Sequence, residues 1–80
     1  MHIKYIPHAL ARMEERGIPK ELVEDTLKHP DKVIEGYLGR KVAQKNINGK
    51  VVRVIYEEDG ENIVVVTAYI TSKLKKYGGE

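Results

Sequence analysis

A histidine and two arginines stand four residues apart near the start of the chain: His8, Arg12 and Arg16, in the stretch PHALARMEERGI. On a helix of 3.6 residues per turn, each step of four advances about 40° beyond a full turn, so the three side chains form one ridge spanning roughly 80°. Two guanidinium groups on such a ridge can fork onto phosphate oxygens, and a histidine one turn away can exchange a proton near neutral pH. The ridge therefore predicts a site for an anion such as a phosphodiester.

The same ridge has a plainer interpretation. Glu15 lies close to His8 and Arg12 on the helical wheel, so exposed ion pairs would account for the spacing without any ligand. Pro7 places His8 in the first turn, near free N–H groups that attract anions and disfavour the imidazolium form. Spacing alone does not decide between a solvated ridge and an anion site.

Sheet residues could complete such a site, and two turn signals predict where they face. Asn48-Gly49 and Asp59-Gly60 are strong signals for two-residue hairpin turns, and ideal turns at these positions would fix the strand register. Counting outward from those turns, Lys45 opposes Val52, and Val52 opposes Thr67. The pattern therefore puts Lys45 and Thr67 on one face of the sheet.

In this register Tyr69 shares the face of Lys45 and Thr67, while Arg53 and Gln44 share the opposite face. An arginine within so apolar a strand is uncommon, because burying its charge without a partner is expensive. If the helices cover the Arg53 face, that arginine must find a carboxylate or extend to solvent; if they cover the Thr67 face, Arg53 lies on the open side. A β-bulge would move residues between faces, so the spacing leaves both arrangements open.

Basic residues are segregated along the chain, although the net charge is only +2. Between Gly36 and Tyr56 there is no acidic residue, and residues 57–61 then contain four. Such a basic half can present a cationic surface to RNA, whereas the alternative is a solvated sheet edge guarded by lysines. The basic residues of this stretch are Arg40, Lys41, Lys45, Lys50 and Arg53, and Lys73, Lys75 and Lys76 follow near the C-terminus.

Length and composition exclude several classes of protein. The 80 residues suffice for a single domain, residues 1–80, whose small core makes a homodimer or a protein partner a reasonable expectation. The absence of cysteine excludes disulfides and thiol chemistry, and there is no apolar run long enough for a membrane span and no signal pattern, so we expect a cytoplasmic protein. A charged fraction of 32% with a single glutamine hints at a thermophile.

No cofactor or metal site is expected from the motifs. The histidines do not have metal-ligand spacing, and the chain contains no phosphate-binding loop, no dinucleotide glycine fingerprint and no serine with a neighbouring base. Chemistry at this site would therefore depend on the side chains alone.

The elements that must position these residues follow from punctuation and periodicity. A short strand is expected at 2–6, a helix from Pro7 to the Gly17 cap, and a second helix from Pro19 to Pro30. Strand candidates follow at 32–38, 41–47, 50–58 and 61–70, and the apolar run at 63–66 predicts a central strand buried on both faces. This order predicts an α+β fold: a short N-terminal strand, two helices on one sheet face, then an antiparallel sheet of three or four strands.

The motifs HALARMEERGI, KHPD, VAQK, RVIY and VVTAY together resemble a family of short bacterial and archaeal proteins, domain-of-unknown-function family 4258, from about Tyr5 to Tyr77. That family is similar to the RelE and ParE toxin superfamily, whose order is one strand, two helices and an antiparallel sheet. The resemblance implies a RelE-like, toxin-like endoribonuclease that cleaves mRNA without metal and is held in check by an antitoxin-like protein.

The resemblance also implies roles for particular residues. In metal-free cleavage the 2′-hydroxyl attacks the adjacent phosphate, so His8 would transfer protons, the arginines would stabilise phosphate charge, Tyr69 would stack a base or donate a proton, and Thr67 would bond a phosphate oxygen. The alternative is a non-catalytic RNA- or protein-binding module on the same fold, since ParE-like relatives inhibit their target by binding. A third interpretation is a housekeeping dimer whose ridge is only surface. The implied catalytic residues are His8, Arg12, Arg16, Arg53 and Tyr69, and the implied substrate-binding residues are Lys45 and Thr67.

Overall fold

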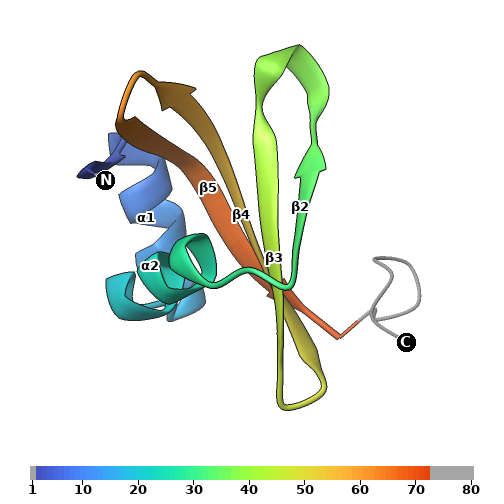
Figure 1. Cartoon of the computed structure of the whole chain (residues 1–80). Helices are drawn as coiled ribbons and strands as arrows, with labels where there is room; N and C mark the ends of the chain where they lie inside the picture. The colour runs from blue at the N-terminus through green and yellow to red at the C-terminus, as the bar shows by residue number, and fades with distance from the viewer. Residues whose placement is uncertain (1, 73–80) are drawn as a thin grey trace.

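The structure, a computed structural model, describes residues 2–72. Five strands form one mixed sheet in the order β1-β5-β4-β3-β2, and two helices lie against it (Figure 1). The three lysines near the C-terminus, Lys73, Lys75 and Lys76, lie outside the described residues. The elements are β1 (His2–Tyr5), α1 (Pro7–Arg16), α2 (Lys20–Lys28), β2 (Lys32–Glu35), the 3-10 turn η1 (Tyr37–Gly39), β3 (Lys41–Ile47), β4 (Lys50–Asp59) and β5 (Asn62–Thr71).

The α+β class is confirmed, but the expected number of strands is wrong. The sheet has five strands rather than three or four, because the N-terminal strand joins it: β1 pairs parallel to β5, from His2 opposite Asn62 to Tyr5 opposite Val65. This pairing satisfies the backbone groups of β1 that face β5, which would otherwise have no partner in the sheet. The antiparallel part consists of β2 to β5.

The helix boundaries follow local signals in the sequence. Pro7 occupies the first turn of α1, and Gly17 ends the helix in the left-handed region at φ +67°. The Ile18 N–H then donates to the Met13 carbonyl at 2.9 Å, which satisfies one of the free carbonyls at the helix end. The second helix begins at Lys20, one residue later than expected, and ends before Pro30 as predicted.

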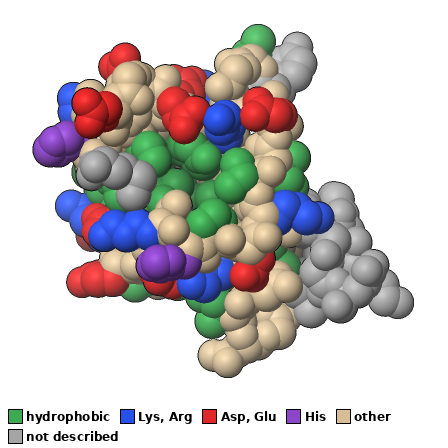
Figure 2. Space-filling view, in the orientation of Figure 1, with side chains coloured by type: hydrophobic (Ala, Val, Ile, Leu, Met, Phe, Trp, Pro, Cys, Tyr) green, Lys and Arg blue, Asp and Glu red, His purple; other side chains and the backbone are tan. Residues whose placement is uncertain are grey.

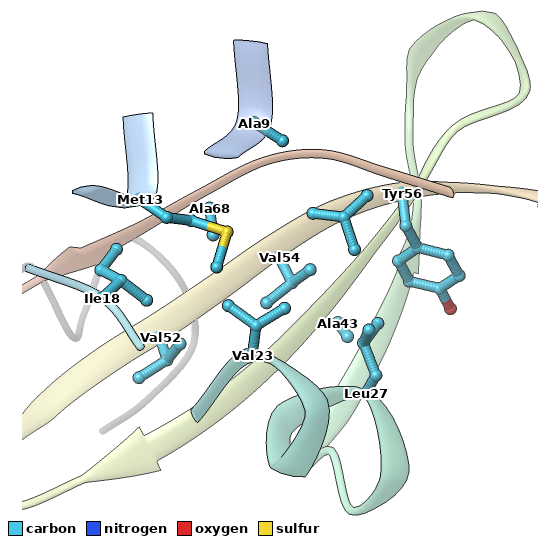
Figure 3. Packing of buried hydrophobic residues seen from close by; sticks show 11 residues of the cluster. Ala9, Met13, Ile18, Val23, Leu27, Ala43, Val52, Val54, Tyr56 and Ala68 are labelled. Carbon is cyan, nitrogen blue, oxygen red and sulfur yellow. The ribbon is translucent and has the colours of Figure 1, made fainter. Parts of the chain in front are cut away.

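Both helices cover one face of the sheet, as expected, and the core lies between them and the strands. Figure 3 shows Met13 of α1 beside Ala68, and Val23 of α2 pointing at Val54. We call this face the helix side, and the other the opposite face. The buried apolar cluster consists of Ala9, Met13, Ile18, Val23, Leu27, Ala43, Val52, Val54, Tyr56, Val65 and Ala68.

The helices leave part of the helix side uncovered. Figure 2 shows apolar side chains at the surface over the strands beside the helices, and Val33 of β2, which faces this side, is 48% exposed. The hairpin that joins β3 and β4 extends beyond the helices (Figure 1). No helix within residues 2–72 is long and apolar enough to cross a membrane.

The prediction that the apolar run at 63–66 forms the central strand is wrong. The central strand is β4, and β5 lies one position from the edge, between β4 and β1. Val65 is fully buried, whereas Ile63, Val64 and Val66 remain partly exposed. Ile63 packs only against the margin of the core cluster, and Val64 pairs with Glu57 on the opposite face, which the helices do not cover.

Candidate nucleic-acid interface

A row of four polar side chains crosses the sheet on consecutive strands. Lys32 of β2 pairs with Gln44 of β3, Gln44 with Arg53 of β4, and Arg53 with Tyr69 of β5. Side chains of directly paired residues point to the same face of a sheet. Because the neighbours of Arg53 in β4 are core residues of the helix side, these four side chains, the polar row, project from the opposite face.

The guanidinium of Arg53 is held between two members of this row. Its Nη1 donates a hydrogen bond to Gln44 Oε1 at 2.7 Å, and its Cζ lies 5.8 Å from the centroid of the Tyr69 ring, within cation–π range. Gln44 is only 3% exposed, so its amide is a fixed acceptor, while Arg53 is half-buried. The guanidinium of Arg53 is therefore already ordered, which lowers the side-chain entropy that an interaction with an anion would cost.

The prediction from the turn signals puts Tyr69 and Thr67 on the wrong face of the sheet, because the structure contains a β-bulge in β5. The turn between β4 and β5 is displaced from its predicted position, since Asp59 pairs with Asn62. This displacement changes the pairing by two residues, which leaves every side chain on its predicted face of the sheet. Between Tyr56↔Val65 and Ile55↔Thr67 the register shifts by one, so that Val66 is the extra residue. This single residue moves Thr67 and Tyr69 to the face of Arg53.

Lys45 therefore does not join Thr67 and Tyr69. It lies on the helix side, where its Nζ bonds Asp25 Oδ2 of α2 at 2.8 Å. This hydrogen bond from Lys45 is the main reason that the pKa of Asp25 lies below its usual value. The structure gives Lys45 a role in attaching α2 to the sheet.

Arg16 is the member of the first-helix ridge that reaches the last strand. Its Nη1 donates to the Ala68 carbonyl at 2.8 Å and lies 3.4 Å from Thr67 Oγ1. This contact is possible because β1 no longer flanks β5 beyond Val65, which leaves that edge accessible from α1. The structure therefore brings Arg16 and Thr67 together, as a site shared by the first helix and the sheet would require.

The rest of the ridge is separate from the polar row. Arg12 pairs with Glu15 at 2.8 Å in an exposed i, i+3 bridge, which fits the plainer interpretation of the spacing. His8 is exposed on α1, on the helix side, whereas Tyr69 projects from the opposite face. The structure does not bring the imidazole of His8 to the ring of Tyr69.

Most of the basic stretch is neutralised in the folded protein. The acidic turn that follows it in sequence folds back on it, so that Arg40 pairs with Glu57 at 3.0 Å and Lys41 with Glu58 at 2.8 Å. Together with the bridge from Lys45, these pairs reduce the cationic surface that the charge pattern predicted.

Lys32 is the member of the polar row that sequence reasoning missed. No two-residue turn links β2 to β3, because the 3-10 turn Tyr37–Gly39 lies between them, so the register of β2 had no local signal. The exposed Lys32 adds a cation at the edge of the row. Within residues 2–72, no three His, Cys, Asp or Glu side chains group together as a metal site would require.

The family described as Domain of unknown function (DUF4258) matches residues 5–70 of the chain. No curated protein and no solved structure gives a significant match.

Proposed function

We propose that this chain, which belongs to the DUF4258 family, is a non-catalytic module that binds single-stranded RNA on the opposite face of its sheet. The description of the family assigns no activity, so the proposal is drawn from the geometry of the polar row. The observation that supports this most directly is the guanidinium of Arg53, fixed between the Gln44 amide and the Tyr69 ring. Arginine beside an aromatic ring suits both a phosphate and an unstacked base.

The dimensions of the polar row suit a short stretch of nucleic acid. Neighbouring strands lie about 4.8 Å apart, so the three steps from β2 to β5 extend roughly 14 Å. A cation at Lys32, a second cation at Arg53 and a ring at Tyr69 follow one another along this line. Thr67, on the same face, adds a hydroxyl that Arg16 already approaches.

Binding is favoured over cleavage because none of the four residues of the polar row is a histidine. Toxin-like RNA cleavage remains the second candidate, and the contact of Arg16 with Thr67 supports it, since one arginine of the ridge reaches the last strand. The RelE-like relationship and an antitoxin-like partner belong to this second candidate and rest on the shared order of strand, helices and antiparallel sheet.

Fluorescence anisotropy with a labelled ten-nucleotide uridine RNA tests binding. Two phosphate contacts, at Lys32 and Arg53, predict a slope of about −1.4 for log K against log salt. Arg53→Gln should weaken binding about fivefold and reduce that slope by about 0.7, and Tyr69→Leu should weaken binding at least fivefold. Lys20→Gln is the matched control, because it removes one positive charge from the helix side and should leave affinity nearly unchanged.

Equal losses in the Arg53 and Lys20 variants would mean only diffuse attraction and would overturn the proposed face. Circular dichroism of each variant checks that the fold is retained. Cleavage has its own test: incubation of the same RNA, and expression in growing cells. RNA cleavage or growth arrest that His8→Ala or Arg12→Ala abolishes without changing Tm would favour the toxin-like enzyme instead.

A further inference from the structure

The outer edge of β2 is a second surface, next to the polar row. β2 is the last strand of the sheet, and within residues 2–72 no strand pairs with its outer side (Figure 1). The Gly36 N–H donates to the Arg40 carbonyl at 2.6 Å, so the backbone groups of Gly36 face β3. Because these groups alternate in direction along an antiparallel ladder, those of Val33 and Glu35 point outward.

Both outward residues of this edge are accessible. Val33 is 48% exposed, and the Glu35 side chain is 82% exposed. Leu38, in the turn that follows β2, is 77% exposed, and its φ of +59° is a left-handed conformation that leucine rarely adopts. Exposed apolar side chains beside unpaired backbone groups form an edge that can pair with another strand.

A second copy of the chain complements this edge in one register. Antiparallel pairing about a two-fold axis at Ile34 sets Val33 opposite Glu35 of the second copy, so that the outward residues of each copy exchange their N–H and C=O bonds. The same register sets Lys32 opposite Gly36, which has no side chain to obstruct the lysine.

Charge excludes the neighbouring registers. An axis at Glu35 would set this carboxylate opposite its own copy, and an axis at Val33 would set Glu35 opposite Asp31; like charges directly opposite each other are destabilising. The N–H of Asp31 is also already donated to the Gln44 carbonyl. An axis between two residues would pair side chains that belong to different faces of the sheet.

We propose that two copies of the chain associate through the outer edges of β2, antiparallel about an axis at Ile34, so that their sheets become continuous. Because the paired edge is short, we expect a weak dimer, with a dissociation constant on the order of 100 μM. The pairing does not depend on the RNA site. One consequence rests on the proposed function: the line of the polar row continues past Lys32 to Gly36 and then Arg40 of the second copy, which lengthens the cationic face.

Disulfide cross-linking tests the register, since the chain contains no cysteine. The axis sets the two copies of residue 34 directly opposite each other, with Cα atoms about 4.5 Å apart, within disulfide range. Ile34→Cys should therefore form covalent dimers under mild oxidation. Lys32→Cys is the matched control: its two copies lie roughly 13 Å apart along the strands and should cross-link far more slowly, although Lys32 is the more exposed residue.

Sedimentation equilibrium over roughly 0.01–1 mM protein measures the association itself. Val33→Pro removes an outward N–H and leaves the bonds to β3 intact, so it should weaken dimerisation about tenfold or more while circular dichroism shows that the fold is retained. Val33→Thr keeps the N–H and should dimerise as the wild type does.

A wild type that stays monomeric over this range would overturn the proposal and leave the edge to a strand of a different protein. Equal cross-linking of the two cysteine variants would exclude the axis at Ile34, and undiminished dimerisation of Val33→Pro would exclude pairing through β2. Failure of the RNA experiment would leave each of these measurements unaffected.

Discussion

Deleting Val66 tests the bulge that assembles the polar row. Val66 is the one residue of β5 without a partner in β4, so its removal should leave a continuous ladder in which Tyr56 still pairs with Val65 and Ile55 with Thr67. Every later side chain then keeps its face, including Tyr69 beside Arg53. Deleting Ala68 instead, with Tyr69 still paired with Arg53, moves Thr67 into the fully buried position opposite Val54 and Val66 into the position opposite Ile55.

The two deletions should differ clearly in their effect on the free energy of unfolding. Loss of the half-buried Val66 side chain removes about half of the 1.5–3 kcal/mol of a fully buried valine, and one regained backbone pair offsets part of that, so the net cost is about 1 kcal/mol or less. In the Ala68 deletion, overpacking costs about 1–3 kcal/mol, and the buried Thr67 hydroxyl adds roughly 1–3 kcal/mol. The second deletion should therefore be more destabilising by about 1 kcal/mol or more.

Urea unfolding followed by circular dichroism measures both free energies of unfolding. In thermal unfolding, the Val66 deletion should lower Tm by less than roughly 8 °C. NMR contacts between the Arg53 and Tyr69 side chains should persist in that variant. The reasoning about the bulge is refuted if removing Val66 destabilises the protein as much as removing Ala68, or if Tyr69 loses its contact with Arg53.

The remaining predictions concern the core, a helix cap and an ion pair. Val54→Ala, at a fully buried position, should cost about 2–3 kcal/mol in chemical unfolding, whereas Val33→Ala, at a position 48% exposed, should cost less than about 1 kcal/mol. Gly17→Ala should cost about 1 kcal/mol because of the left-handed φ of +67°, and Gly17→Asn less; near-equal stability of all three proteins would contradict the cap. The hydrogen bond from Lys45 lowers the pKa of Asp25, so its stabilising contribution is complete above the unfolded-state pKa of about 4 and disappears as the pH falls through the lower folded-state pKa. Urea midpoints of the wild type and Lys45→Met should therefore converge in acid, and a constant difference at all pH values would exclude this linkage.

The local elements could be predicted from the sequence because their signals lie within a few residues of one another. Pro7 and Gly17 delimit the first helix, and the Asn48-Gly49 turn pairs Ile47 with Lys50 as expected. The exposed bridge between Arg12 and Glu15 also follows from helical spacing alone. In each case the interaction that fixes the geometry closes a short loop of chain.

The placement of the basic residues depended on contacts that spacing does not encode. The stretch that looks cationic in sequence is neutralised by carboxylates from elsewhere, such as Asp25 on α2 for Lys45 and Glu58 for Lys41. Those partners become neighbours only once the sheet has formed and α2 has packed on it. Charge counted along a sequence therefore overestimates the charge on the folded surface.

The sequence by itself determined the helices, their caps, the first hairpin and the α+β class. The tertiary structure decided that β1 lies parallel to β5, that a bulge at Val66 moves Thr67 and Tyr69 to the face of Arg53, and that His8 stays on the other side of the sheet. The physical reason is that strand faces alternate with a period of two, so one unpaired residue reverses every later side chain, and only pairing across distant strands decides where that residue is accommodated.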